Sequence, residues 1–192
     1  MNKAITFFVS SFAICCCQVA VAQSTQVRGM KMGLGATVER FWKEIGIGHL
    51  KEAYQVLTND VERLTPGSNH IRALCLAQEL GWSEKVTEHQ KALQAEYART
   101  PEKHGEGLLR VAMELNKPTP QWASLQKRHP DWSLLHSLLG MGATYDAVGC
   151  YKMSGKVLAA LKATCATSPL VKDFETKRAR AMETTRQNAK SP

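Results

Sequence analysis

Helical periodicity, broken by glycine and proline turns, is the feature that most limits how this 192-residue chain can fold. From Thr37 onward apolar residues recur three and four positions apart, which is typical of helices that bury one face. Strand signals are scarce, because there are no long Val/Ile/Thr alternations and no Asn-Gly or Asp-Gly hairpin turns between apolar runs. Ala, Leu, Glu, Lys and Gln, which are good helix formers, dominate instead. The sequence therefore predicts an all-α domain.

Small residues divide the helical pattern into pairs of helices. Gly48 and Gly81 each stand between two apolar stripes and are 33 residues apart, and Asn116 takes the corresponding place 35 residues later. A further turn is expected at Ser154-Gly155. Such regular spacing is typical of stacked helical hairpins. We therefore expect a right-handed stack of antiparallel helical hairpins, an α-solenoid-like fold, over residues 36–170.

The hairpin spacing resembles the tetratricopeptide repeat, a helix-turn-helix unit of about 34 residues. In that family a small turn residue is followed by Ala, by a bulky apolar residue and finally by Pro. The matching residues are Gly48, Ala53, Leu57 and Pro66 in the first unit and Gly142, Ala147 and Tyr151 in the last. The unit at Gly81 departs from the pattern, because Val86 and Gln90 follow it. The resemblance implies stacked copies that form a groove for peptides.

The first 22 residues have the pattern of a secretory signal peptide. Lys3 precedes a long apolar run that ends in Ala20-Val21-Ala22, the small-x-small pattern read by a signal peptidase. We expect cleavage between Ala22 and Gln23, a flexible leader over residues 23–35, and a periplasmic or secreted location. A transmembrane anchor is the alternative, but the run is short for a membrane span. After cleavage no transmembrane segment is expected.

The excess of positive over negative charge lies in the second half of the mature chain. Residues 23–116 hold 12 basic and 12 acidic residues, whereas residues 117–192 hold 12 basic and 5 acidic residues, a net charge of +7. Either an anionic partner or a merely solvated basic face explains this excess. Residues 171–192 are expected to form a basic helical or disordered tail that buries little area. No nucleic-acid partner is expected.

Three cysteines remain after the expected cleavage: Cys75, Cys150 and Cys165. In an oxidising compartment an odd number implies one bridge and one free thiol. Cys150 and Cys165 are the nearest pair, with Cys75 as the buried spare. A turn at Ser154-Gly155 would leave this pair roughly 9 Å out of register. The bridge therefore requires the turn to lie nearer Lys156 or the chain to bend, and the pairing stays open.

No motif in the chain indicates a specific chemistry. Zinc-protease, Cys-x-x-Cys, phosphate-loop and nucleophile-elbow patterns are all missing from the sequence, so we predict no catalytic residue, no metal and no cofactor. Trp42 lies on an apolar stripe and is expected in the core. Tryptophans at turns and cations of the tail are the candidate partner contacts. These residues are Trp82, Trp122, Trp132, Lys177, Arg178 and Arg180.

These observations favour an exported, non-catalytic protein-interaction module. It would act as an adaptor, chaperone or accessory factor of a bacterial envelope, secretion or conjugation machine. The expected partner is a protein, and the basic tail favours an acidic one or contact with a membrane surface. Two alternatives stay open: an all-α envelope hydrolase or lytic enzyme without a recognisable motif, and a small inhibitor or immunity-type protein.

Overall fold

The computed structural model describes residues 32–59, 66–99 and 104–190. The chain divides into two compact units, Met1–Glu39 and Arg40–Pro192. Within the first unit the described part is only the beginning of helix α2. The expected signal peptide, its cleavage site at Ala22 and Gln23, and most of the expected leader lie outside the described residues. The second unit contains the rest of α2 and every later helix.

Every regular element among the described residues is an α-helix, which confirms the all-α prediction. The helices are α2 (Met32–Gly46), α3 (Leu50–Asn59), α4 (Pro66–Leu80), α5 (Ser83–Tyr97), α6 (His104–Leu115), α7 (Trp122–Arg128), α8 (Leu134–Ala147), α9 (Tyr151–Thr164) and α10 (Pro169–Asn188). None of the described helices is long and apolar enough to cross a membrane.

Three of the connections between helices are the same turn, built on a glycine with positive φ. Gly48, Gly81 and Gly149 have φ values of 81°, 73° and 70°. Each glycine N–H donates to the carbonyl three residues back, and the next N–H donates to the carbonyl five residues back. This is the Schellman motif, in which glycine avoids the cost of left-handed backbone. It joins α2 to α3, α4 to α5 and α8 to α9 as helical hairpins.

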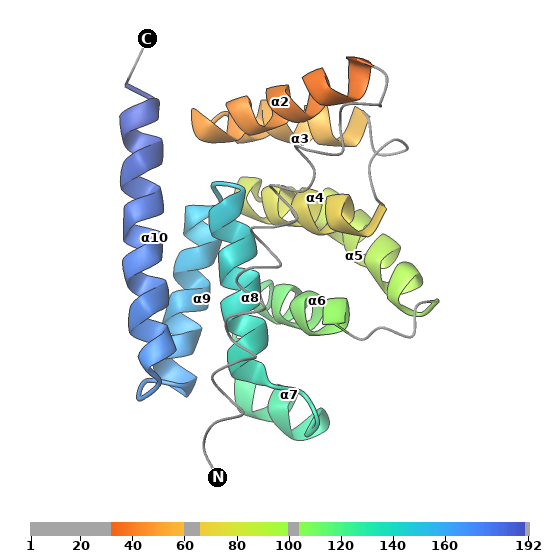
Figure 1. Ribbon diagram of the computed structural model, residues 1–192. Coiled ribbons are helices and arrows are strands. Elements are labelled where there is room, and N and C mark those ends of the chain that lie inside the picture. Colours follow the sequence, from red (N-terminus) through yellow and green to blue (C-terminus); the bar gives the residue numbers. More distant parts are fainter. Residues whose placement is uncertain (1–31, 60–65, 100–103, 191–192) are drawn as a thin grey trace. The chain divides into compact units, whose positions relative to one another are not determined.

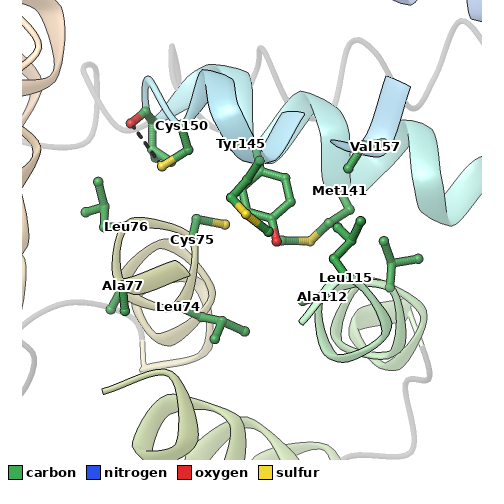
Figure 2. Close-up of a cluster of buried hydrophobic side chains, with 14 of the residues drawn as sticks. Leu74, Cys75, Leu76, Ala77, Ala112, Leu115, Met141, Tyr145, Cys150 and Val157 are labelled. Atoms are coloured by element: carbon green, nitrogen blue, oxygen red, sulfur yellow. Dashed lines mark hydrogen bonds between the residues drawn. The ribbon is translucent and has the colours of Figure 1, made fainter. Parts of the chain in front are cut away.

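Helix α4 lies at the centre of the core. Its residues Ala73 to Ala77 are all completely buried, because α4 packs against α3, α5, α8 and α9. Figure 2 shows side chains of α4, α6, α8 and α9, among them Cys75, Tyr145 and Met141, meeting in one apolar cluster. In a linear stack each hairpin contacts only its neighbours. The contacts of α4 with α8 and α9 span a longer sequence distance, so the solenoid arrangement is not confirmed.

The expected turn at Ser154-Gly155 is wrong, because α9 runs without interruption from Tyr151 to Thr164. The turn lies at Gly149, and Ser154 is completely buried within the helix. The predicted Cys150–Cys165 disulfide is wrong for the same reason. These residues are the caps at opposite ends of α9, roughly 22 Å apart at 1.5 Å per residue, whereas a bridge needs Cα atoms within about 7 Å. Cys75, Cys150 and Cys165 are all free thiols.

Helix α10 packs against α8 and α9, and Figure 1 shows the three helices side by side. Val171 and Phe174 are buried, which corrects the expectation that the basic C-terminal segment buries little. The Phe174 ring lies over Gly142, where an added Cβ would stand 2.5 Å from the ring. Gly142 therefore lies inside α8 as a packing position and does not form the turn that the tetratricopeptide-like spacing suggested.

Candidate functional site

The three tryptophans predicted as partner contacts are half-buried and pack against the core. The Trp82 ring meets the Tyr54 ring edge-on, with ring centres 5.1 Å apart. Trp132 lies over Gly107, and its indole Nε1 is buried without a hydrogen-bond partner. Trp122 begins α7 and also packs on the core. Their contacts are those of residues that anchor helix connections.

The predicted cations of α10 have different surroundings from one another. Lys177 forms an ion pair with Asp173 at 2.7 Å on the same helix. Arg178 instead binds α9, where its Nε donates to the Ser154 hydroxyl and its Nη2 donates to the Tyr151 carbonyl, both at 2.7 Å. Arg180 is exposed to solvent. Arg178 therefore holds α10 in place, whereas Lys177 and Arg180 are both exposed to solvent.

Trp42, expected in the core, is instead 38% exposed. Phe41 and Ile45, which are four positions apart, take the buried face of α2, and the Phe41 ring contacts Trp42 edge-on at 4.9 Å. Adjacent helical positions are rotated by about 100°, so Phe41 and Trp42 cannot both face the same core. That pair of adjacent aromatic residues is the sequence signal that was missed.

Arg72 of α4 stacks on the exposed tryptophan. Its guanidinium carbon lies 5.4 Å from the centre of the Trp42 ring, within the range of a cation–π interaction. Arg72 is half-buried, and no ion pair with a carboxylate of the described residues involves it. Burial lowers the pKa of Arg72 because it disfavours the charged form. We call Trp42 and Arg72 the Trp–Arg surface.

A second polar cluster joins α3, α4 and α5. The Tyr54 hydroxyl lies 2.8 Å from His89 Nε2, and His70 Nδ1 lies 3.2 Å from His89 Nδ1. His89 is only 3% exposed. Burial, followed by the charge of His70, lowers the pKa of His89 to about 4. His89 is therefore neutral at pH 7.

Other buried polar groups form hydrogen bonds from one helix to another and hold the helices together. The Gln78 amide accepts from the Tyr145 hydroxyl at 2.5 Å and donates to the Ala112 carbonyl at 2.8 Å. Glu79 accepts from the backbone N–H groups of Lys152 and Met153, which caps the N-terminus of α9. These bonds tie α4 to α6, α8 and α9.

Asp146 is a carboxylate with one buried, unpaired oxygen. It is half-buried at the end of α8, and its Oδ1 has no hydrogen-bond partner. Burial raises the pKa of Asp146, and Ser154 and Arg178 act in the opposite direction. Among the described residues, no group of three or more His, Cys, Asp or Glu side chains could hold a metal ion.

No protein-family model, curated protein or solved structure matches this chain.

Two arrangements thus stand out among the described residues. The Trp–Arg surface is an exposed aromatic ring beside a half-buried cation, which suits contact with another molecule. The His70–His89–Tyr54 cluster is a set of hydrogen-bonded groups that can exchange protons, and His89 and Tyr54 are buried. The sequence singled out neither, because its periodicity shows which residues share a face but not which helix covers that face.

Proposed function

We propose that this protein is an exported, non-catalytic interaction module that binds a protein partner through the Trp–Arg surface. The exposed Trp42 ring under the Arg72 guanidinium is the observation that carries the proposal. Tryptophan and arginine are the residue types most often responsible for binding energy at protein interfaces. Arg72 lacks a carboxylate partner in the described chain, so a partner that offers an acidic side chain beside an apolar one fits best.

The repeated hairpin turns support the same class of protein. Gly48, Gly81 and Gly149 close three helical hairpins with the same turn. Stacked helical hairpins typically present extended surfaces to other proteins. The apolar run of residues 4–21 supports export to the periplasm or beyond. An adaptor, chaperone or accessory role in a bacterial envelope machine suits this combination.

Capture with surface variants tests the proposal. A tagged chain that starts at Gln23 is used to retain proteins from the envelope fraction of the cells that make it. We expect Trp42→Ala and Arg72→Gln to weaken retention of the partner at least about tenfold, as for interface hot spots. Met113→Ala is the matched control, because Met113 is 36% exposed and lies on α6.

Equal retention by all three variants would remove the Trp–Arg surface from the proposal, and retention of no protein would contradict the interaction function itself. Arg72→Lys separates charge from stacking, because it keeps the cation and loses the planar guanidinium. A captured enzyme that loses its activity in the complex would favour the inhibitor alternative.

A further inference from the structure

His70 of α4 and His89 of α5 face each other through their Nδ1 atoms. His70 Nδ1 lies 3.2 Å from His89 Nδ1, and the far nitrogen of His89, Nε2, lies 2.8 Å from the Tyr54 hydroxyl. Because His89 is buried, both of its ring nitrogens depend on these partners. A hydrogen bond between two Nδ1 atoms requires one proton between them.

The hydrogen bonds among Tyr54, His89 and His70 determine how many protons these three side chains can hold. With both rings neutral, His89 donates from Nδ1 to His70 and accepts at Nε2 from Tyr54. One added proton preserves both contacts, because either ring can carry it and the Tyr54 hydroxyl can accept. A second added proton places N–H groups on both Nδ1 atoms. The two hydrogens then point at each other between nitrogen atoms that are only 3.2 Å apart.

The surroundings of the pair provide no strong compensating charge. From α5, Lys85 and Glu88 act on His89 in opposite directions, and these two side chains form an ion pair at 2.7 Å. The group from α3 is the neutral Tyr54 hydroxyl, and the group from α4 is His70 itself. Among the described residues, neither ring has a hydrogen bond to a carboxylate. A doubly charged pair is therefore repelled and largely desolvated.

We propose that the His70–His89 pair makes the attachment of the α2–α3 hairpin sensitive to acid. The pair holds α3 against α4 and α5 while it carries at most one added proton, and binding of the second proton releases α3. This inference rests on the proposed function where it concerns regulation. Trp42 lies on α2, which the Gly48 turn joins to α3. Release of the hairpin therefore separates Trp42 from Arg72 and dismantles the Trp–Arg surface.

The proton count is tested by an NMR titration of the histidine ring nitrogens in the chain that starts at Gln23. We expect the second proton to bind the pair only near pH 4. In His70→Gln the repelling charge is removed, so His89 should bind its proton at a higher pH. His70 is partly exposed, so this variant should keep the fold. A His89 titration that is the same in His70→Gln and in the wild type would overturn the coupling.

The release of α3 is tested by amide hydrogen exchange, corrected for the intrinsic pH dependence of exchange. Below about pH 4.5 we expect α3 amides to lose protection roughly tenfold relative to α9 amides. His89→Gln, which cannot become charged, should abolish this difference, and the matched control His136→Gln on α8 should not. Equal protection of α3 at pH 7 and pH 4 would overturn the proposal. Neither measurement needs a partner, so its failure is distinct from failure of the binding test.

Discussion

At the scale of single residues, Phe174 and Gly142 form a contact that depends on the absence of a side chain. The Phe174 ring of α10 is 6% exposed and occupies the space above Gly142 of α8. Protein interiors are packed at the density of organic crystals, so a single methyl group at this position must displace its neighbours. The closeness of α10 to α8 therefore depends on both residues together.

We expect Gly142→Ala to lower the free energy of unfolding by about 1–3 kcal/mol, because the new Cβ meets Phe174 and Val157. Phe174→Ala should cost about 3–5 kcal/mol through loss of buried area. Urea denaturation of both single variants and of the double variant measures the coupling. The double variant should be more stable than the sum of the two losses predicts. Additive losses would show that the two residues do not share this space.

His89 should make stability depend on pH. Its pKa is about 4 in the folded protein and about 6.5 in the unfolded chain, so the unfolded chain binds more protons between these values. Stability due to His89 is therefore present above pH 6.5 and is lost as the pH falls toward 4. We expect a loss of about 2 kcal/mol between pH 7 and pH 5. Urea midpoints at both pH values measure it, and a loss of the same size in His89→Gln would contradict the assignment.

At the scale of helices and turns, the positive φ of three glycines defines where hairpins close. Gly81 has φ of +73° and open space where a Cβ would stand, whereas Gly46 has the same open space without a positive φ. The two positions therefore differ in backbone strain alone, which makes them a matched pair.

We expect Gly81→Ala to lower the free energy of unfolding by about 1–2 kcal/mol, because L-residues are strained in left-handed backbone. Gly46→Ala at the end of α2 should have no such cost and should stabilise the helix by several tenths of a kcal/mol. Thermal unfolding of both variants gives the comparison. A similar loss of stability in both variants would mean that the positive φ is not what disfavours a side chain at residue 81.

Helix α10 should contribute to the stability of the second unit. Removal of residues 169–192 deletes Val171, Phe174 and the two Arg178 hydrogen bonds to α9. From the loss of Phe174 alone we expect at least about 3 kcal/mol, which corresponds to a fall of roughly 6–12 °C in Tm. The control is removal of only residues 189–192, which leaves α10 complete. Equal Tm values for both truncations would mean that α10 is an independent tail that does not stabilise the second unit.

At the scale of the whole molecule, the number of reactive thiols reports both removal of the expected signal peptide and folding. Burial raises the pKa of the Cys75 and Cys150 thiols, and both side chains are fully buried, whereas Cys165 is half-exposed. Exported protein that begins at Gln23 should show three thiols in denaturant, compared with six in the uncleaved chain. In native buffer only Cys165 should react quickly with a thiol reagent. Intact mass before and after alkylation measures both numbers.

The sequence predicted the all-α fold class well, because helical periodicity depends only on local spacing. It located the turns at Gly48 and Gly81, where glycine separates two clear apolar stripes. It misplaced the third turn, because Gly149, Ser154 and Gly155 are all small and spacing alone does not show which has a positive φ. Trp42 was misplaced because exposure depends on which helix covers a face. The His70–His89 contact was invisible because it joins residues 19 positions apart through their side-chain orientation.

The three glycine turns also bear on how chains of this kind change in length during evolution. Gly149 follows Gly81 by 68 residues, close to twice the 33 that separate Gly48 from Gly81. Asn116 stands between them, but α6 ends there without the hydrogen bond five residues back that closes the other hairpins. A gain or loss of one closed hairpin keeps the register of every remaining turn, whereas a shorter insertion inside a helix rotates its buried face.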